Sequence, residues 1–128
     1  MADEAKTLLD AVRFDAAGLV PVITQEHRTG EVMMMAWMNR ESLEETMKTG
    51  RLCYWSRSRQ ELWRKGETSG HVQKLIEMRV DCDGDTLLAL IEQTGAACHT
   101  GASNCFYQAA TGDALVDVIP ARFGAMQT

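Results

Sequence analysis

The chain has 128 residues, of which 45% are hydrophobic and 24% charged, and these values predict one globular domain over residues 1–128. The net charge of −5 argues against generic nucleic-acid binding. The charge is uneven, because residues 51–74 hold six Lys and Arg against two Glu, and a local charge of +4 in an acidic chain indicates a site for an anionic ligand.

The spacing of apolar residues predicts two helices and two strands in the first part of the chain. Residues 4–13 are expected to form a short amphipathic helix, and residues 19–24 a strand. Segment 31–37 is apolar on both of its faces, so we predict a strand at the centre of a sheet. Segment 40–49 follows an asparagine that suits a helix N-cap and precedes a glycine that suits a helix C-terminus, which predicts a helix.

Strand patterns dominate the middle of the chain. A strand rich in aromatic residues is predicted over 52–56, followed by a polar and basic loop over 57–70. Alternating apolar residues at the end of 72–80 predict a strand, and 86–92 is predicted to be another. The residues between them, 81–85, include a glycine and are expected to form the turn of a β-hairpin.

The last part of the chain is less regular. Residues 95–101 begin and end with glycine and are predicted to form a loop, whereas 105–107 are predicted to form a strand. The tail from residue 109 onward carries no informative pattern. Together these elements predict an α+β fold, a compact single domain with a mainly antiparallel sheet and short helices.

Three aspartates stand at alternate positions of the predicted turn, at Asp81, Asp83 and Asp85. Neighbouring carboxylates repel one another, and a group of oxygen ligands suits Mg²⁺ or Ca²⁺. The spacing also matches an EF-hand loop, but Thr86 stands where that loop requires glycine, and the flanking segments are predicted strands. We therefore predict a site for a hard divalent cation, with an acidic, solvated turn as the alternative.

The sequence shows no export signal, and this bears on the expected redox state of its cysteines. The first six residues, MADEAK, are acidic and lack the apolar run of a signal peptide, and the longest apolar run, residues 32–38, is too short to cross a membrane. We therefore expect a cytoplasmic protein without a membrane partner. In that compartment the four cysteines are expected to be thiols or metal ligands rather than disulfides.

Cys82 lies among the aspartates and Cys98 in the glycine-bounded loop, and neither place is typical of a protein core. With Cys105 they would provide three thiolates, which leave the fourth position of a tetrahedral zinc ion open for water, as in catalytic zinc sites. The alternative is three buried thiols that only pack. Cys53 would close the site if it joined, but its place in the predicted strand 52–56 favours a packing role.

The basic loop, residues 57–70, is rich in groups that bind phosphate, namely guanidinium groups, hydroxyls and backbone N–H groups near glycine. A solvated basic surface is the alternative. His71 follows this loop and His99 follows Cys98, so both are candidates for proton transfer, with a structural hydrogen bond as the alternative. The candidate substrate-binding residues are Arg57, Arg59, Arg64, Lys65, Thr68 and Ser69.

Over residues 30–107, more than half of the chain, these motifs together resemble one enzyme family, the phosphoribosyl-AMP cyclohydrolases of histidine biosynthesis. No single segment would be sufficient, but the combination is specific. The matching segments are EVMMMAWMNR (31–40), YWSRSR (54–59), LWRKGETSGHVQ (62–73), DCDGD (81–85) and EQTGAACHTGASNCFY (92–107).

The resemblance implies a reaction. The family opens the adenine ring of 1-(5-phosphoribosyl)-AMP by hydrolysis at the N1–C6 bond, which gives phosphoribosylformimino aminoimidazole carboxamide ribotide in L-histidine biosynthesis. Zinc lowers the pKa of a bound water to about 7, so hydroxide is available to add to C6 at neutral pH. The two phosphate groups of this substrate would explain the basic loop. Some relatives are fused to a phosphoribosyl-ATP pyrophosphohydrolase domain, whereas here we expect a separate protein to supply the substrate.

The resemblance also implies a homodimer that shares its zinc ligands, Cys82 from one subunit and Cys98 and Cys105 from the other. It places Mg²⁺ at Asp81, Asp83 and Asp85. Cys53 departs from the family pattern, because many members have histidine there. Two other functions stay open at this point: a Ca²⁺-binding interaction domain, and a zinc-stabilised nucleic-acid-binding module that would use the basic loop with Tyr54, Trp55 and Trp63.

Overall fold

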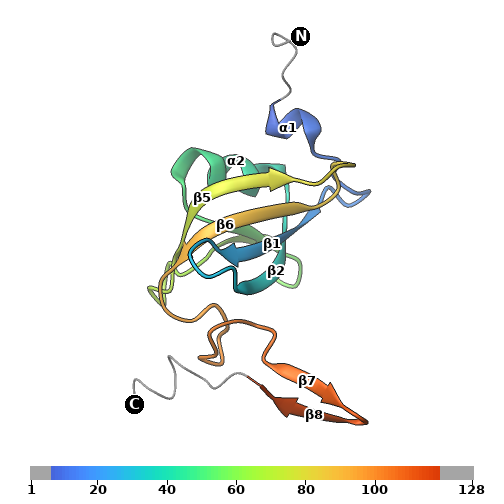
Figure 1. The fold of residues 1–128 in the computed structure, drawn as a ribbon. Coiled ribbons are helices and arrows are strands. Elements are labelled where there is room, and N and C mark those ends of the chain that lie inside the picture. Colours follow the sequence, from blue (N-terminus) through green and yellow to red (C-terminus); the bar gives the residue numbers. More distant parts are fainter. Residues whose placement is uncertain (1–6, 119–128) are drawn as a thin grey trace.

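The computed structural model describes residues 7–118, which form two helices and eight strands (Figure 1). The predicted helix over 4–13 is shorter than expected, and its first three residues lie outside the described residues. The elements are α1 (Leu8–Ala11), β1 (Val20–Glu26), β2 (Val32–Met38), α2 (Arg40–Thr49), β3 (Cys53–Ser56), β4 (Glu61–Arg64), β5 (Gln73–Val80), β6 (Leu87–Gln93), β7 (Gln108–Thr111) and β8 (Ala114–Asp117).

The largest sheet has four strands in the order β2-β1-β6-β5. Strands β1 and β6 are parallel, and the other two pairs are antiparallel, so the predicted α+β fold with a mainly antiparallel sheet is confirmed. Helix α2 lies against β2 and β3. Among residues 7–118, the structure contains no helix with the length and apolar character that a membrane span requires.

The prediction of a central strand over 31–37 is wrong, because β2 lies at an edge of this sheet. The register between β1 and β2 shifts at Met33, which is left without a partner residue on β1. This bulge buries Met33 and Met34 in succession, while Val32 and Met35 stay exposed. The pattern that suggested two covered faces therefore comes from an irregular strand rather than from a central one.

The predicted hairpin at 81–85 is confirmed, since β5 and β6 are antiparallel neighbours on either side of it. Gly84 has a φ of 80°, and a Cβ atom there would lie 2.4 Å from the Ala11 carbonyl oxygen, so only glycine fits this close approach. The alternation predicted for β5 holds at Met78 and Val80 but fails at Ile76, which sits in a bulge and is exposed.

The hydrophobic core lies between the four-stranded sheet, α2 and the β3–β4 hairpin. Its largest fully buried side chains include Met38, Leu43, Leu52 and Tyr54. Helix α2 forms as predicted, because Asn39 makes a capping box at its start and Gly50 ends it with a φ of 75°.

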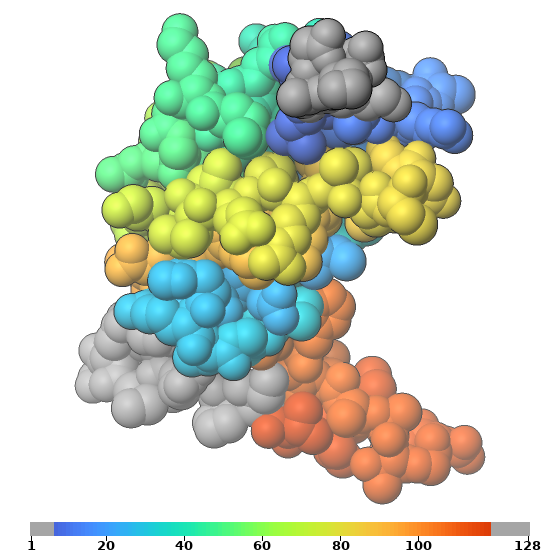
Figure 2. Space-filling model, turned by 45° about the horizontal axis from the view of Figure 1, so that its top comes forward, coloured from blue at the N-terminus to red at the C-terminus, as the bar shows by residue number. Residues whose placement is uncertain are grey.

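Two small hairpins, β3–β4 and β7–β8, complete the described chain. Strand β4 lies inside the segment predicted to be a loop, and β7 and β8 lie in the tail that carried no pattern. The strand predicted over 105–107 is absent from the described residues. In this segment the Cys105 N–H donates to the Met33 carbonyl at 2.8 Å, and the Tyr107 carbonyl accepts from the Val118 N–H at 2.8 Å. The β7–β8 hairpin projects from the rest of the molecule (Figures 1 and 2).

Candidate functional site

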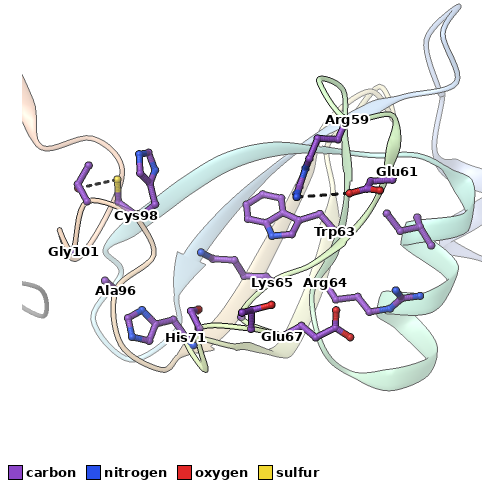
Figure 3. A pocket seen from close by; sticks show the side chains of 16 residues that line it. Arg59, Glu61, Trp63, Arg64, Lys65, Glu67, His71, Ala96, Cys98 and Gly101 are labelled. Atoms are coloured by element: carbon purple, nitrogen blue, oxygen red, sulfur yellow. Dashed lines mark hydrogen bonds and ion pairs between the residues drawn. The ribbon is translucent and has the colours of Figure 1, made fainter.

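A pocket with a volume of about 640 Å³ lies between the β4 segment and the loop that follows β6 (Figure 3). One wall comes from β4 and the residues after it, and the other comes from residues 96–101. The basic loop, residues 57–70, and the loop that carries Cys98 and Cys105, residues 94–105 and here called the cysteine loop, therefore face one cavity. Its main functional side chains are Arg59, Glu61, Trp63, Arg64, Lys65, Glu67, Thr68, Ser69, His71, Cys98, His99 and Thr100.

Strand β4 is held in place by the aromatic pair Tyr54 and Trp63. These residues are directly opposite in the β3–β4 register, and their ring centroids are 5.4 Å apart. Leu62 is also partly buried, so β4 is a half-buried strand rather than a solvated loop. The sequence signal was weak, since only two apolar residues stand between two charged ones.

The pocket's cations point in different directions. Lys65 extends toward the cysteine loop, where its ammonium donates a hydrogen bond to the Ala97 carbonyl at 2.8 Å (Figure 3). Burial, the main influence, lowers the pKa of Lys65. Arg64 extends to the other side and makes two hydrogen bonds with Glu45, at 2.6 and 2.9 Å. Its guanidinium is therefore already paired with a carboxylate.

Two further predicted phosphate ligands differ in their placement. Arg59 lies in the pocket wall, 3.7 Å from the Glu61 carboxylate, which is a loose ion pair at the surface. Arg57 is outside the pocket lining, because its guanidinium stacks 4.5 Å from the centre of the Trp37 ring. Thr68 and Ser69 line the pocket, and the Ser69 hydroxyl accepts a hydrogen bond from the His71 backbone N–H at 3.2 Å.

The loop between β6 and β7 folds back on itself and carries both Cys98 and Cys105. The Ala97 N–H donates to the Ser103 carbonyl at 3.1 Å, and the Gly101 N–H donates to the Cys98 carbonyl at 3.0 Å. The prediction of a loop over residues 95–101 is confirmed. The tight turn of this loop brings the two thiols close enough for each to influence the pKa of the other.

The electrostatic surroundings of the two thiols differ. Burial disfavours the Cys98 thiolate, but hydrogen bonds from Thr100 and Cys105 and the charge of Lys65 outweigh it, so the pKa of Cys98 is lowered. The Thr100 hydroxyl donates to the Cys98 sulfur at 3.1 Å. Desolvation and the neighbouring Cys98 raise the pKa of Cys105 to about 11. A soft cation would favour both thiolates, so this pair fits two ligands of a zinc ion.

Cys82 is not part of this cluster within one chain. It lies in the β5–β6 turn, whereas Cys98 and Cys105 lie beyond the opposite end of β6. Strand β6 has seven residues. At the usual rise per residue such a strand spans roughly 20 Å, so the same zinc ion cannot contact all three thiols of one chain.

The three aspartates of the β5–β6 turn form a compact acidic cluster. Ligand oxygens of Asp81, Asp83 and Asp85 all lie within 4.8 Å of one another, and all three residues are exposed. Hydrogen bonding with Asp81 and then with Asp83 raises the pKa of Asp85. Asp81 also has a structural role, because its Oδ1 accepts hydrogen bonds from the backbone N–H groups of Asp85 and Thr86 at 3.0 and 3.3 Å. The cluster fits a hard cation, which would relieve this repulsion.

Both candidate histidines line the pocket, on its two walls. His71 follows the β4 segment, and its ring packs against Gly95, where a Cβ atom would lie 2.7 Å from the ring carbon Cδ2. His99 is exposed beside Cys98. The structure therefore brings both imidazoles to the cavity, with His71 held by the cysteine loop.

Three residues that support the loop were not predicted from the sequence. The Glu31 carboxylate accepts hydrogen bonds from Ser103 and Asn104 at 2.8 and 2.6 Å. Gln73 and Gln93 are joined through their side chains at 2.8 Å. A polar residue inside an apolar strand pattern, as at position 73, is the only sequence signal that could have marked one of them.

Two minor predictions are also decided. Cys53 is buried in β3, where burial raises its pKa to about 11, and this agrees with the predicted packing role. Tyr54 is fully buried with its hydroxyl bonded to Gln73, so it cannot stack on a base as the nucleic-acid alternative requires.

Comparisons with known proteins find similar sequences that share one family name. The sequence model of the family "Phosphoribosyl-AMP cyclohydrolase" matches residues 34–107. A protein of that name from Acidiphilium cryptum is 64% identical over 111 residues, which cover 87% of this chain and 96% of the relative. Similar proteins from Rhodospirillum rubrum and Alkalilimnicola ehrlichii, with the same name, are 65% and 63% identical over 81% and 84% of this chain, and 73% and 76% of their own lengths.

Proposed function

Because this chain belongs to the phosphoribosyl-AMP cyclohydrolase family, we propose that it hydrolyses the N1–C6 bond of 1-(5-phosphoribosyl)-AMP in L-histidine biosynthesis. The product would be phosphoribosylformimino aminoimidazole carboxamide ribotide. The observation that carries the proposal is the 640 Å³ pocket, in which basic side chains face a loop with thiols and an imidazole. A phosphorylated nucleotide needs the first wall, and hydrolysis of its ring needs the second.

The direct test is a ring-opening assay. Purified protein is incubated with 1-(5-phosphoribosyl)-AMP, and loss of the adenine chromophore is followed with and without a zinc chelator. Turnover that stops with the chelator and returns with added Zn²⁺ is the expected result. Absence of turnover with zinc and magnesium both present would refute the function, and turnover unaffected by chelation would refute the zinc dependence alone.

The metal requirement is proposed from the donor set. Cys98 and Cys105 would provide two thiolates, and Cys82 of a second copy would provide the third. When bound, zinc would supply a water molecule acidic enough to react at neutral pH. The residues of this chain would keep the loop closed around it, since Lys65 holds the Ala97 carbonyl and Thr100 holds the Cys98 sulfur.

A homodimer is proposed because Cys82 is exposed at the far end of β6 and requires a partner chain to complete the thiol set. Exposed apolar residues on the projecting β7–β8 hairpin, including Leu115 and Val116, are consistent with contact to another copy.

A mixing experiment tests the shared site. Cys82→Ser and Cys98→Ser proteins should each be inactive, but one site in each mixed dimer keeps all of its wild-type thiols. Equal mixing after reversible dissociation should therefore restore about a quarter of wild-type activity. Mixed dimers that form without regaining activity would show that the thiols are not shared between subunits.

The substrate's phosphates are proposed to bind the β4 wall of the pocket. Arg59, Lys65, Thr68 and Ser69 offer donors there, whereas Arg57 and Arg64 are engaged elsewhere in this structure and are weaker candidates. We propose Mg²⁺ at the three aspartates of the β5–β6 turn. That turn is distant from the pocket in one chain, so the cation would serve the pocket of the second copy.

The two histidines are proposed to manage protons. Cleavage of the bond to N1 leaves that nitrogen in need of a proton, and the attacking water must lose one. His99, beside Cys98, would transfer a proton at this point, and His71, packed on Gly95, would orient the ring from the other wall. A cytoplasmic location, where the thiols stay reduced, is part of the same proposal.

A further inference from the structure

We infer that Gln73 positions the cysteine loop, residues 94–105, through a buried chain of side-chain hydrogen bonds that begins at Tyr54. Gln73 is fully buried on β5, and it stands directly opposite Gln93 of β6. Its Oε1 accepts a hydrogen bond from the Tyr54 hydroxyl. Its Nε2 donates to the Gln93 Oε1 at 2.8 Å and to the Met34 sulfur at 3.4 Å. Both ends of the Gln73 amide are therefore used inside the core.

The chain of hydrogen bonds leaves the core at Gln93. Because the Oε1 of Gln93 accepts from Gln73, its Nε2 must face the loop, where it donates to the Thr94 carbonyl at 3.1 Å and to the Ala96 carbonyl at 3.5 Å. The next carbonyl, that of Ala97, accepts from the Lys65 ammonium. Two consecutive peptide groups directly before Cys98 are thus held by side chains.

This arrangement gives Gln73 a role beyond filling the core. Without its amide, the Gln93 side chain loses the partner that sets its orientation, and the hydrogen bond to Ala96 loses its direction. Cys98 lines the pocket but only 8% of it is exposed, so opening of the loop should speed the reaction of its thiol with a reagent. A weaker anchor would make that opening more frequent. The consequence for the proposed function is a thiol pair that is less well placed for zinc.

The test compares Gln73→Leu with Thr46→Val in the full-length chain. Thr46 is a suitable control because it is equally buried, and its hydroxyl makes hydrogen bonds to the Ser42 and Cys53 backbones, at 2.8, 3.1 and 2.9 Å, on the α2 and β3 side of the core. Each protein is treated with a chelator and then with iodoacetamide. Peptide mass spectrometry gives the alkylation rates of Cys98 and Cys53 separately, and urea unfolding gives the loss of stability.

The two variants are expected to increase the alkylation of different cysteines. Gln73→Leu should raise the alkylation rate of Cys98 about tenfold or more, which is the usual cost of a buried polar group left without its partner, and should change Cys53 less. Thr46→Val should do the reverse. Equal increases at both cysteines in both variants would reflect global destabilisation and would overturn the inference. If Gln73→Leu does not fold, Gln93→Leu breaks the same series of hydrogen bonds at its half-buried end. An unchanged alkylation rate of Cys98 in that variant would also overturn the inference.

The zinc arm of the experiment rests on the proposed function and is kept separate. Zinc affinity, measured by competition with a chromophoric chelator, should fall in Gln73→Leu by a factor similar to the rise in Cys98 alkylation. Failure of the wild-type protein to bind zinc would count against the proposed function only, because the alkylation rates are measured without metal.

Discussion

Glu26 links the end of β1 to the end of β6, directly before the cysteine loop, and its removal should destabilise the protein in a pH-dependent way. Its carboxylate accepts hydrogen bonds from the Gln93 backbone N–H at 2.8 Å and from the Arg28 backbone N–H at 2.8 Å, and it pairs with the Arg28 guanidinium at 3.0 Å. Burial opposes the charged form, but these hydrogen bonds outweigh it and lower the pKa of Glu26 from 4.5 to about 2.

The pKa shift sets both the size and the pH range of the effect. Each pKa unit corresponds to about 1.4 kcal/mol, so the shift gives an upper limit of about 3 kcal/mol for the stability that ionised Glu26 contributes. The Arg28 side chain is 57% exposed, and solvent screens its share, so we expect about 1–2 kcal/mol. Because the folded-state pKa is the lower one, this stability is present above pH 4.5 and is lost as the pH falls toward 2.

The assay is urea unfolding of wild type and Glu26→Gln between pH 3 and 7, at one fixed protein concentration. The variant should be less stable at pH 7, and the difference should shrink toward pH 3. Glu77→Gln is a matched control, because Glu77 also pairs with an arginine two residues later, at 2.8 Å, but its side chain is 52% exposed against 7% for Glu26. A Glu26→Gln difference that is independent of pH, or no larger than that of Glu77→Gln, would refute the reasoning.

Three further predictions concern the site. Arg59→Ala should raise KM for 1-(5-phosphoribosyl)-AMP by about tenfold or more, because a charge-assisted hydrogen bond to the substrate is lost. Arg64→Ala should leave KM nearly unchanged, because the Arg64 guanidinium is already paired with a carboxylate. Steady-state kinetics measure both values, and a larger KM increase in Arg64→Ala than in Arg59→Ala would contradict this assignment. Asp83→Asn should increase the Mg²⁺ concentration needed for activity without lowering zinc content by metal analysis, and an unaltered Mg²⁺ requirement would exclude the site. His99→Ala should lower kcat by about 10²–10⁴-fold with zinc retained, and a near-normal kcat would transfer the proposed role to His71.

Features that depend on neighbours in the chain could be predicted from the sequence. Helix α2 is determined by its own capping residue, Asn39, and by Gly50 at its end. The carboxylates of the β5–β6 turn are brought together by a five-residue segment, so their proximity follows from the turn alone. In both cases a few backbone torsion angles decide the geometry, and residue type controls those angles directly.

Features that depend on long-range pairing could not be predicted. The parallel pairing of β1 with β6 joins residues far apart in sequence, and it leaves β2 at an edge although its composition suggested the centre. Strand β4 depends on Trp63 packing against Tyr54 of a different strand. The preference of a short segment is weak, so the energy of a distant contact decides its conformation.

The same distinction applies to the candidate site. The residue types established thiols, imidazoles and a basic segment as its chemistry, because these properties belong to single side chains. Only the tertiary structure decided that Arg59, Arg64 and Lys65 line the pocket and that Arg57 stacks on Trp37 instead. It also decided that the Arg64 guanidinium pairs with Glu45. A flexible cation on a surface strand has several partners within reach, and the fold determines which of them lies closest.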